Sequence, residues 1–337
     1  MGIRVAVVGA SGYAGGEVLR LVAGHPEFEL VAATAHSQVG APVGSVHPHL
    51  IGIGLTFQPA TPEALAGADL VFLALPHGES GAVAATLPDG VKVVDLGADH
   101  RLRDPEQWKA YYGGEHAGTW TYGLPELPGQ RELIASSTRV AATGCYAVAT
   151  ILALAPLIRS GLVSPEDVVV VAASGTTGAG RSLKPHLLAS EVMGDLSGYK
   201  VGTHQHVPEI KQATGATSLS FTPVLAPMPR GILATVTARP STPDVTAEDV
   251  RAVLAQAYDG EPFVRLLPPG VWPRTKATLG SNACHLQATV DRDSGRVLVQ
   301  SAIDNLGKGA AGQAVQCANL MVGLPETTGL TAVGVNP

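Results

Sequence analysis

One of the three cysteines, Cys145, directly follows a glycine and directly precedes a long apolar run, in the stretch ATGCYAVATILAL. Thr143 is a suitable helix N-cap and residues 147–158 form a suitable helix body, so we expect the thiol in the first helical turn. The positive end of the helix dipole stabilises a thiolate there, and the first N–H groups can hold an oxyanion. Position alone leaves two interpretations open, a nucleophile and a buried core thiol.

The other two cysteines have the pattern of core residues. Cys284 lies in step with Leu286, Ala288 and Val290 on an alternating strand, and Cys317 lies among apolar residues of the last helix. Three widely spaced cysteines also do not form the even set of a disulfide framework. The sequence therefore indicates a reducing compartment and leaves Cys145 as the candidate nucleophile.

The stretch GTHQHVPEI contains the histidines that could shuttle a proton for such a thiolate. Glu209 follows His206 by three residues, about one helical turn, so its carboxylate can orient or stabilise the imidazole. The pair His204 and His206 could instead bind a metal. No further cluster of Cys, His or Asp with suitable spacing accompanies the pair, so we predict no metal site.

A glycine-rich loop follows the first β-branched run, RVAVV. Gly9, Gly12 and Gly15 are spaced G-x-x-G-x-x-G and open a helical pattern, where glycines let a pyrophosphate approach the backbone. The segment after the second predicted strand, LVAATAHSQVG, lacks the acidic residue that usually binds the ribose of NAD. His36 and Ser37 could surround a 2′-phosphate there, which favours NADP.

Four basic residues lie at strand ends or in glycine-containing loops: Arg101, Arg181, Arg230 and Lys308. Each alone is more often a solvated surface charge. Together they suit a substrate that carries carboxylate and phosphate groups.

The elements around these residues indicate an α/β protein of two domains. Nearly continuous apolar runs alternate with helical patterns over the first 140 or so residues, which is typical of a Rossmann-like, doubly wound parallel sheet. The second half has several strands that alternate apolar and polar residues, which predicts an α+β domain with a mixed or antiparallel sheet.

Bulk properties exclude several classes of protein. The 337 residues are 45% hydrophobic and 15% charged, with a net charge of −6 and no basic cluster, which argues against a nucleic-acid partner. The longest apolar run, residues 147–158, is too short to span a bilayer, and the N-terminal stretch does not have the pattern of a signal peptide. We expect a soluble cytoplasmic protein with no membrane partner.

These motifs together resemble a known family. GASGYAG, LALPHG, DLGADHRL, YGLPELP, GCY, SGTTGAGR, HQHVPEI, PMPRGI and AIDNLGKGAAGQAVQ occur in this order over nearly the whole chain. The set resembles the N-acetyl-γ-glutamyl-phosphate reductases of arginine biosynthesis. More distantly, it is similar to the aspartate-semialdehyde dehydrogenases.

The resemblance implies an NADP-binding Rossmann domain over residues 1–144 and 309–337, and a catalytic, substrate-binding and oligomerisation domain over residues 145–308. It implies that Cys145 is the nucleophile, that His206 is the acid/base and that Glu209 supports it. It also implies a homodimer or homotetramer. The residues expected to bind NADP(H) are Gly9, Ser11, Gly12, Tyr13, Gly15, His36, Ser37, Pro76, Gly175 and Gly178.

The implied reaction is the NADPH-dependent reduction of N-acetyl-γ-glutamyl phosphate to N-acetylglutamate semialdehyde and phosphate, through a thioester on Cys145. Arg101 is the candidate for the phosphate contact. Thr143 stands where the family usually has proline, and Gln205 stands where it usually has arginine. An aspartate-semialdehyde dehydrogenase and a carrier-bound acyl-phosphate reductase are the nearest alternative functions. A non-catalytic, NADP-sensing regulator is a third alternative.

Overall fold

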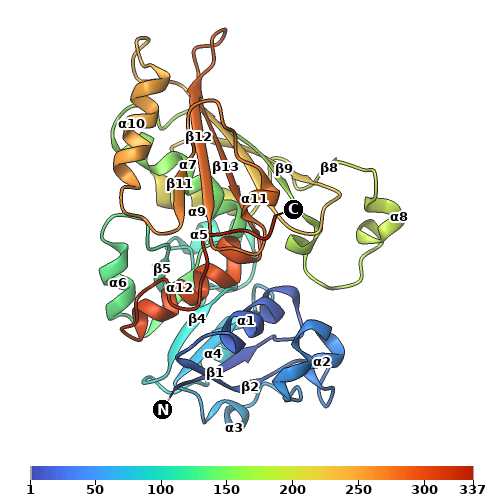
Figure 1. Cartoon of the computed structure of the whole chain (residues 1–337). Helices are drawn as coiled ribbons and strands as arrows, with labels where there is room; N and C mark the ends of the chain where they lie inside the picture. The colour runs from blue at the N-terminus through green and yellow to red at the C-terminus, as the bar shows by residue number, and fades with distance from the viewer. Residues whose placement is uncertain (1, 337) are drawn as a thin grey trace. The chain divides into compact units, whose positions relative to one another are not determined.

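The computed structural model of the chain describes residues 2–336, which divide into two compact units (Figure 1). The first unit runs to Thr143 and includes Ala310–Leu330. The second runs from Gly144 to Gly309 and includes the chain from Thr331 on.

The last segment of the chain differs from the expected grouping of residues 309–337 with the first domain. From Thr331 on, it makes backbone hydrogen bonds to the second unit. The N–H of Asn282 donates to the carbonyl of Thr331 over 2.8 Å, and the N–H of Val335 donates to the carbonyl of Leu279 over 2.8 Å.

The first unit is built on a six-stranded sheet ordered β2-β1-β3-β4-β6-β5, in which every neighbouring pair is parallel. Its strands are β1 (Ile3–Val8), β2 (Phe28–Ala33), β3 (Leu70–Leu73), β4 (Lys92–Asp95), β5 (Thr121–Gly123) and β6 (Arg139–Ala142). Val5 and Val7 of β1 contribute to one apolar core, while Ala6 and Val8 contribute to another. Both faces of the sheet are therefore covered, which is why the central residues of its longer strands are mostly apolar.

The helical segments of the first unit are α1 (Tyr13–Ala23), α2 (Val43–Val46), η1 (Pro48–Ile53), α3 (Pro62–Leu65), α4 (Ser80–Ala84), α5 (Pro105–Tyr111), α6 (Gln130–Ser136) and α12 (Gly312–Met321). Along the chain, β2 is added on one side of β1 and β3 on the other side, so the direction of strand order reverses at β1. Ligands of open α/β sheets bind at the carboxyl ends of the strands at such a point.

The second unit is built on a seven-stranded mixed sheet ordered β11-β12-β13-β10-β7-β9-β8. Its strands are β7 (Val168–Ser174), β8 (Ser197–Gly198), β9 (Leu219–Leu225), β10 (Ile232–Ala238), β11 (Val264–Leu266), β12 (Cys284–Val290) and β13 (Val297–Ile303). Two pairs are parallel, β7 with β9 and β11 with β12, and the other four pairs are antiparallel.

The helical segments of the second unit are α7 (Cys145–Arg159), η2 (Thr176–Ala179), η3 (Pro185–Leu187), α8 (Ala189–Val192), α9 (His206–Thr214), α10 (Ala247–Ala257) and α11 (Thr275–Thr278). Helix α7 packs against β10 and β13, and both α9 and α10 pack against α7. A π-helical turn, η4 (Gly307–Ala311), follows β13 and precedes α12.

These two sheets confirm the predicted fold class. The segments predicted as continuous apolar runs form the parallel sheet. The segments that alternate apolar and polar residues form the mixed sheet. On β10, for example, Ile232, Ala234 and Val236 are buried, whereas Leu233 and Thr235 between them are partly exposed. Across residues 2–336, no helix combines the length and apolarity needed to cross a membrane.

Candidate active site

Cys145 is the first residue of α7 and is partly exposed. Gly144 is the N-cap, with extended backbone angles (φ −66°, ψ 147°), so the prediction that Thr143 caps the helix is wrong. Thr143 directly follows β6, and its N–H donates to Oε1 of Gln313 over 2.8 Å, while its hydroxyl donates to the carbonyl of Gly123. The thiol still lies in the first helical turn, where the dipole favours a thiolate.

Glu209 connects the helix that carries His206 to the helix that carries Cys145. Its side chain is buried, and its Oε1 accepts the N–H of Gly144 over 2.9 Å. Glu209 lies one turn after His206, which opens α9. The sequence predicted that this carboxylate supports the imidazole, a role that stays a prediction, and the structure adds the contact with the N-terminus of α7.

His204 fixes the backbone at His206. The N–H of His206 donates to Nδ1 of His204 over 3.2 Å, and the two rings meet edge to face with centroids 4.9 Å apart. Burial, followed by the charges of His206 and Lys200, lowers the pKa of His204 to about 2. His204 is therefore neutral at physiological pH.

Tyr146 joins this group from the first turn of α7. Its ring lies edge to face with His206, with centroids 6.0 Å apart, and its hydroxyl accepts the hydroxyl proton of Tyr199 over 3.0 Å. Burial raises the pKa of both phenols, that of Tyr199 to about 12. Both hydroxyls therefore stay protonated and act as neutral hydrogen-bonding groups near the cysteine.

The turn η4 approaches the cysteine through a glycine. A Cβ added at Gly309 would lie 2.9 Å from the Cβ of Cys145, closer than side chains pack. Lys308, just before it, is buried, with its Nζ 5.7 Å from the ring centroid of Phe263. The predicted contact of Lys308 with the substrate stays a prediction, and it concerns an ammonium group that is buried in the second unit.

Arg230, which is partly exposed, forms an ion pair with the buried Asp304, the residue that follows β13. Its Nε lies 3.1 Å from Oδ1 and its Nη2 lies 2.9 Å from Oδ2. Oδ1 also accepts the N–H groups of Leu306 and Gly307, so the carboxylate holds the start of η4. The structure thus gives Arg230 a bracing partner, and its predicted substrate contact stays a prediction.

The second glycine-rich loop has both a buried and an exposed end. A Cβ added at Gly175 would lie 2.8 Å from the backbone of Arg230 and Pro229, so this glycine allows a close approach of two chain segments. Gly178 and Arg181 are exposed. The predicted contacts of these glycines with the cofactor, and of Arg181 with the substrate, stay predictions.

In the first unit, the glycine-rich loop leaves β1 and opens α1. Gly9 has φ +73°, and a Cβ there would lie 2.3 Å from the carbonyl oxygen of Ala74, at the end of β3. A Cβ at Gly15 would lie 2.4 Å from the carbonyl oxygen of Gly9. Gly12 is the N-cap of α1, whose first turn carries no acidic residue. The loop therefore has the close backbone packing and the unopposed dipole that suit a pyrophosphate.

The other predicted cofactor residues lie at the ends of neighbouring strands. Ser11 and Tyr13 belong to the loop and the start of α1, His36 and Ser37 follow β2, and Pro76 follows β3. In the order β2-β1-β3 these strand ends are adjacent, so the fold gathers the five residues at one edge of the sheet.

Asp99 organises the loop after β3, a role that was not predicted from the sequence. Its Oδ1 accepts the N–H of Gly78 over 2.6 Å, and its Oδ2 accepts the N–H of Gly81 over 3.1 Å. The one available signal was its motif, DLGADHRL, which places an acid just past a buried strand. Asp304 and Gln313 were missed in the same way, since their partners are distant in sequence.

Arg101 lies at the predicted strand end but is only 7% exposed. Its Nε donates to the carbonyl of Ala142 and its Nη2 donates to the carbonyl of Leu96, both over 2.7 Å. These bonds join the segment after β4 to the last residue of β6. Arg101 therefore holds the backbone just before Cys145, and the phosphate contact predicted for it stays a prediction.

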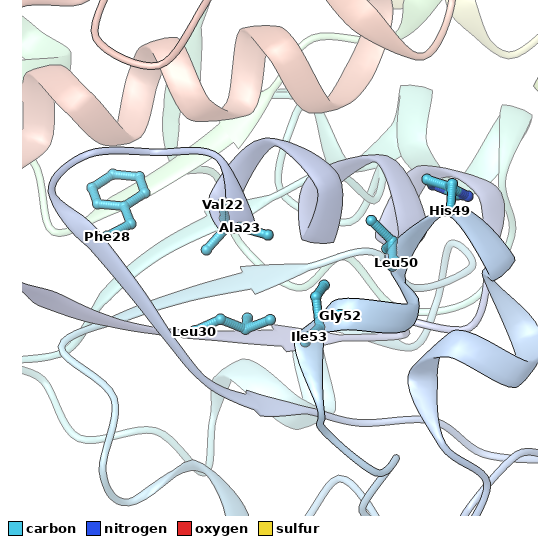
Figure 2. Close-up of a pocket in the computed structure, with 8 residues that line it drawn as sticks. All are labelled: Val22, Ala23, Phe28, Leu30, His49, Leu50, Gly52 and Ile53. Atoms are coloured by element: carbon cyan, nitrogen blue, oxygen red, sulfur yellow. The ribbon is translucent and has the colours of Figure 1, made fainter.

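An open pocket of about 410 Å³ lies elsewhere in the first unit (Figure 2). It is lined by Val22, Ala23, Phe28, Leu30, His49, Leu50, Gly52 and Ile53. None of these residues belongs to the glycine-rich loop or to the predicted site. We therefore do not place cofactor or substrate in it. Among residues 2–336, no three His, Cys, Asp or Glu side chains gather as metal ligands would.

Two family models match most of the chain. Residues 4–137 match the NAD binding domain of semialdehyde dehydrogenase, and residues 145–305 match its dimerisation domain. The first match covers the glycine-rich loop, and the second begins at Cys145. The first domain is therefore an NAD(P)-binding domain.

Curated relatives match over the full length of both chains. The N-acetyl-gamma-glutamyl-phosphate reductase of Salinispora arenicola is 73% identical over 337 residues, with 100% of each chain covered. That of Acidothermus cellulolyticus is 63% identical over 344 residues, again with 100% of each covered.

Solved structures share the fold at low identity. Aspartate semialdehyde dehydrogenase II of Vibrio cholerae, in complex with ASA, is 17% identical with a TM-score of 0.69 and covers 96% of this chain and 98% of its own. The Candida albicans aspartate semialdehyde dehydrogenase with NADP is 18% identical with a TM-score of 0.67, over 96% and 99%. With relatives of such high identity over its whole length, the chain belongs to the N-acetyl-gamma-glutamyl-phosphate reductase family, within the semialdehyde dehydrogenases.

Proposed function

We propose that the chain reduces N-acetyl-γ-glutamyl phosphate to N-acetylglutamate semialdehyde, with NADPH as reductant and release of phosphate, in arginine biosynthesis. The observation that carries this proposal is the arrangement in the second unit. Cys145 opens α7, and the helix that begins with His206 is bonded to the same N-terminus through Glu209. Full-length relatives named for this activity support the substrate.

Acylation of Cys145 is the first step. His206 accepts the thiol proton, and the thiolate attacks the γ-carbonyl carbon of the acyl phosphate. N–H groups in the first turn of α7 stabilise the oxyanion. The bond between the carbonyl carbon and the phosphate oxygen then breaks. Phosphate leaves, and the acyl group stays on Cys145 as a thioester.

Release of the aldehyde is the second step. NADPH, when bound, supplies the hydride that reduces the thioester carbonyl. The bond from that carbon to the sulfur of Cys145 then breaks, and the thiol recovers its proton from His206. Because His204 is neutral, it serves as a positioning residue, which leaves the proton transfer to His206.

NADPH rather than NADH is proposed because the end of β2 carries no acidic residue. A carboxylate at this position would bind the ribose 2′-hydroxyl of NAD and would repel a 2′-phosphate. His36 and Ser37 are exposed there instead. We expect the ratio kcat/KM to be higher for NADPH than for NADH, and equal values would contradict this cofactor choice.

A homodimer or homotetramer in the cytoplasm completes the proposal. One face of the second sheet is partly exposed, and the 46% exposed Val171 on it pairs with Thr235 of β10 and with Thr222 of β9. This open face supports a contact between subunits, as does the match to a dimerisation domain. No disulfide links the cysteines of residues 2–336, which fits a reducing compartment.

The reverse reaction separates this function from its nearest alternative. Purified chain is given NADP, phosphate and either N-acetylglutamate semialdehyde or aspartate semialdehyde, and NADPH formation is followed by absorbance. We expect turnover with the N-acetylated aldehyde and little with the other. Preference for aspartate semialdehyde would contradict the proposal, and turnover of neither would favour a non-catalytic protein.

A further inference from the structure

A buried histidine, His47, lies beneath the glycine-rich loop of the first unit. Its Nε2 is 2.9 Å from the carbonyl oxygen of Ala10, the second residue of the loop. A carbonyl oxygen only accepts hydrogen bonds, so Nε2 carries the proton and donates it. None of the motifs identified in the sequence includes this residue.

The same imidazole also packs against the start of α1. A Cβ added at Gly16 would lie 2.5 Å from Cε1 of His47 and 2.9 Å from each of its ring nitrogens. Glycine at this position therefore leaves room for the ring. The bond to Ala10 and the packing on Gly16 place one side chain across the whole turn from β1 into α1.

The ring is itself held by its neighbours. His47 directly follows α2 and precedes η1, its N–H donates to the carbonyl of Val43 over 2.9 Å, and its carbonyl accepts the N–H of Leu50 over 2.8 Å. The ring of Phe57 meets the imidazole edge to face, with centroids 6.3 Å apart. The donor is therefore fixed before any ligand binds.

This contact has a direct consequence for the amides of the loop. A trans peptide directs its C=O and its N–H to opposite sides. A bond that holds the carbonyl of Ala10 towards His47 turns the N–H of Ser11 the other way. Glycine-rich loops of this kind present such N–H groups to the pyrophosphate of a dinucleotide.

We propose that His47 is a positioning residue for the cofactor: it holds the Ala10 carbonyl on the inner side of the loop so that the loop presents its N–H groups to the pyrophosphate. The inference rests on the proposed use of NADPH. His47 does not touch the dinucleotide in this scheme. It acts through the backbone of the loop, so it sets affinity for the cofactor rather than the rate of the chemical step.

The test compares His47→Leu, which removes the donor, with His47→Gln, whose amide nitrogen can replace Nε2. His186→Leu is the control, because His186 is exposed and belongs to the second unit, whereas His49 contacts the His47 ring edge to face with centroids 6.0 Å apart. The dissociation constant for NADPH is measured by fluorescence on the purified full chain without substrate. KM for NADPH, KM for the acyl phosphate and kcat are measured separately.

We expect His47→Leu to weaken NADPH binding about tenfold, the loss typical of one buried hydrogen bond and the order it imposes. KM for NADPH should rise to match, while kcat and KM for the acyl phosphate should stay within about twofold of wild type. His47→Gln should recover most of the affinity, and His186→Leu should bind as wild type does.

Wild-type affinity in His47→Leu would overturn the inference, and so would a loss confined to kcat. If His47→Leu does not fold, His47→Gln still tests the inference, because glutamine keeps a donor. A loss of NADPH affinity of about tenfold in His47→Gln would show that the hydrogen bond to Ala10 does not set the affinity. Absence of NADPH binding by the wild-type chain would instead refute the proposed function, and this inference with it.

Discussion

Because Gly309 packs closely against Cys145, we expect a larger side chain at position 309 to lower the rate of catalysis. In Gly309→Ala, the new Cβ would start 2.9 Å from the Cβ of Cys145 and 3.3 Å from its Cα. Ordinary packing begins near 3.4 Å, so one partner must move by about half an ångström. The closest of these atoms belongs to the nucleophile, and the third neighbour, the carbonyl oxygen of Asp304, lies at 3.3 Å. The displacement therefore falls on the group that must meet the acyl carbon.

Misplacement of a reacting group by about 1 Å costs on the order of 10²-fold in rate, so we expect kcat to fall between about 10-fold and 10²-fold in Gly309→Ala. Steady-state turnover with NADPH and the acyl phosphate measures the loss. Gly90→Ala is the matched control, because a Cβ at Gly90 meets no atom within 4 Å. The first variant should lose activity while keeping its NADPH affinity, and the control should keep both.

Turnover of Gly309→Ala within twofold of wild type would refute this reasoning, because the nucleophile would then tolerate a side chain against it. A loss of NADPH affinity as large as the loss in kcat would also contradict it. That result would locate the damage outside the surroundings of Cys145.

The remaining predictions concern three other residues. Glu209→Ala should lower kcat by about 10-fold or more, because it removes the acceptor of the Gly144 N–H, while Glu209→Gln, which keeps an oxygen there, should lose less; equal losses would count against this role. Burial raises the pKa of Asp95 from 3.8 to about 6, so folding is penalised once the group must ionise. Urea unfolding should therefore show roughly 3 kcal/mol of stability lost as pH rises from about 4 to above 6, and Asp95→Asn should lack this component; parallel pH curves for the two proteins would contradict the assignment. Val171→Asp should shift the chain towards monomer in sedimentation velocity, because it puts a charge on the open sheet face, and an unchanged oligomer would exclude that face.

Most of the fold could be predicted from local sequence patterns. Apolar runs marked β1 to β4 of the first sheet because both faces of that sheet are buried, whereas the three-residue β5 has no such run. The alternation on β10 marked a sheet with one covered face. The glycine-rich loop was equally visible, since its position after one strand and before one helix is itself a local property.

Contacts between distant segments could not be predicted in this way. Gly309 lies beside Cys145 and Arg101 bonds to Ala142, yet no pattern within either segment specifies its partner. The same holds for His47, whose acceptor lies 37 residues earlier.

The prediction that Thr143 caps α7 was wrong for a local reason. Threonine is a good N-cap by type, but Thr143 directly follows β6 and already uses its N–H and hydroxyl in bonds to Gln313 and Gly123. Glycine at position 144 therefore starts the helix without a side-chain cap. The cap is one residue from its predicted place, and Cys145 remains in the first turn.

The most direct test of the central claim is to trap the acyl-enzyme. The chain is mixed with N-acetyl-γ-glutamyl phosphate without NADPH, and its peptides are analysed by mass spectrometry. The account predicts one N-acetylglutamyl group bound to Cys145, released phosphate in equal amount, and loss of the adduct as aldehyde when NADPH is added. An adduct on Cys284 or Cys317, or reduction of the acyl phosphate by Cys145→Ser at the wild-type rate, would contradict it.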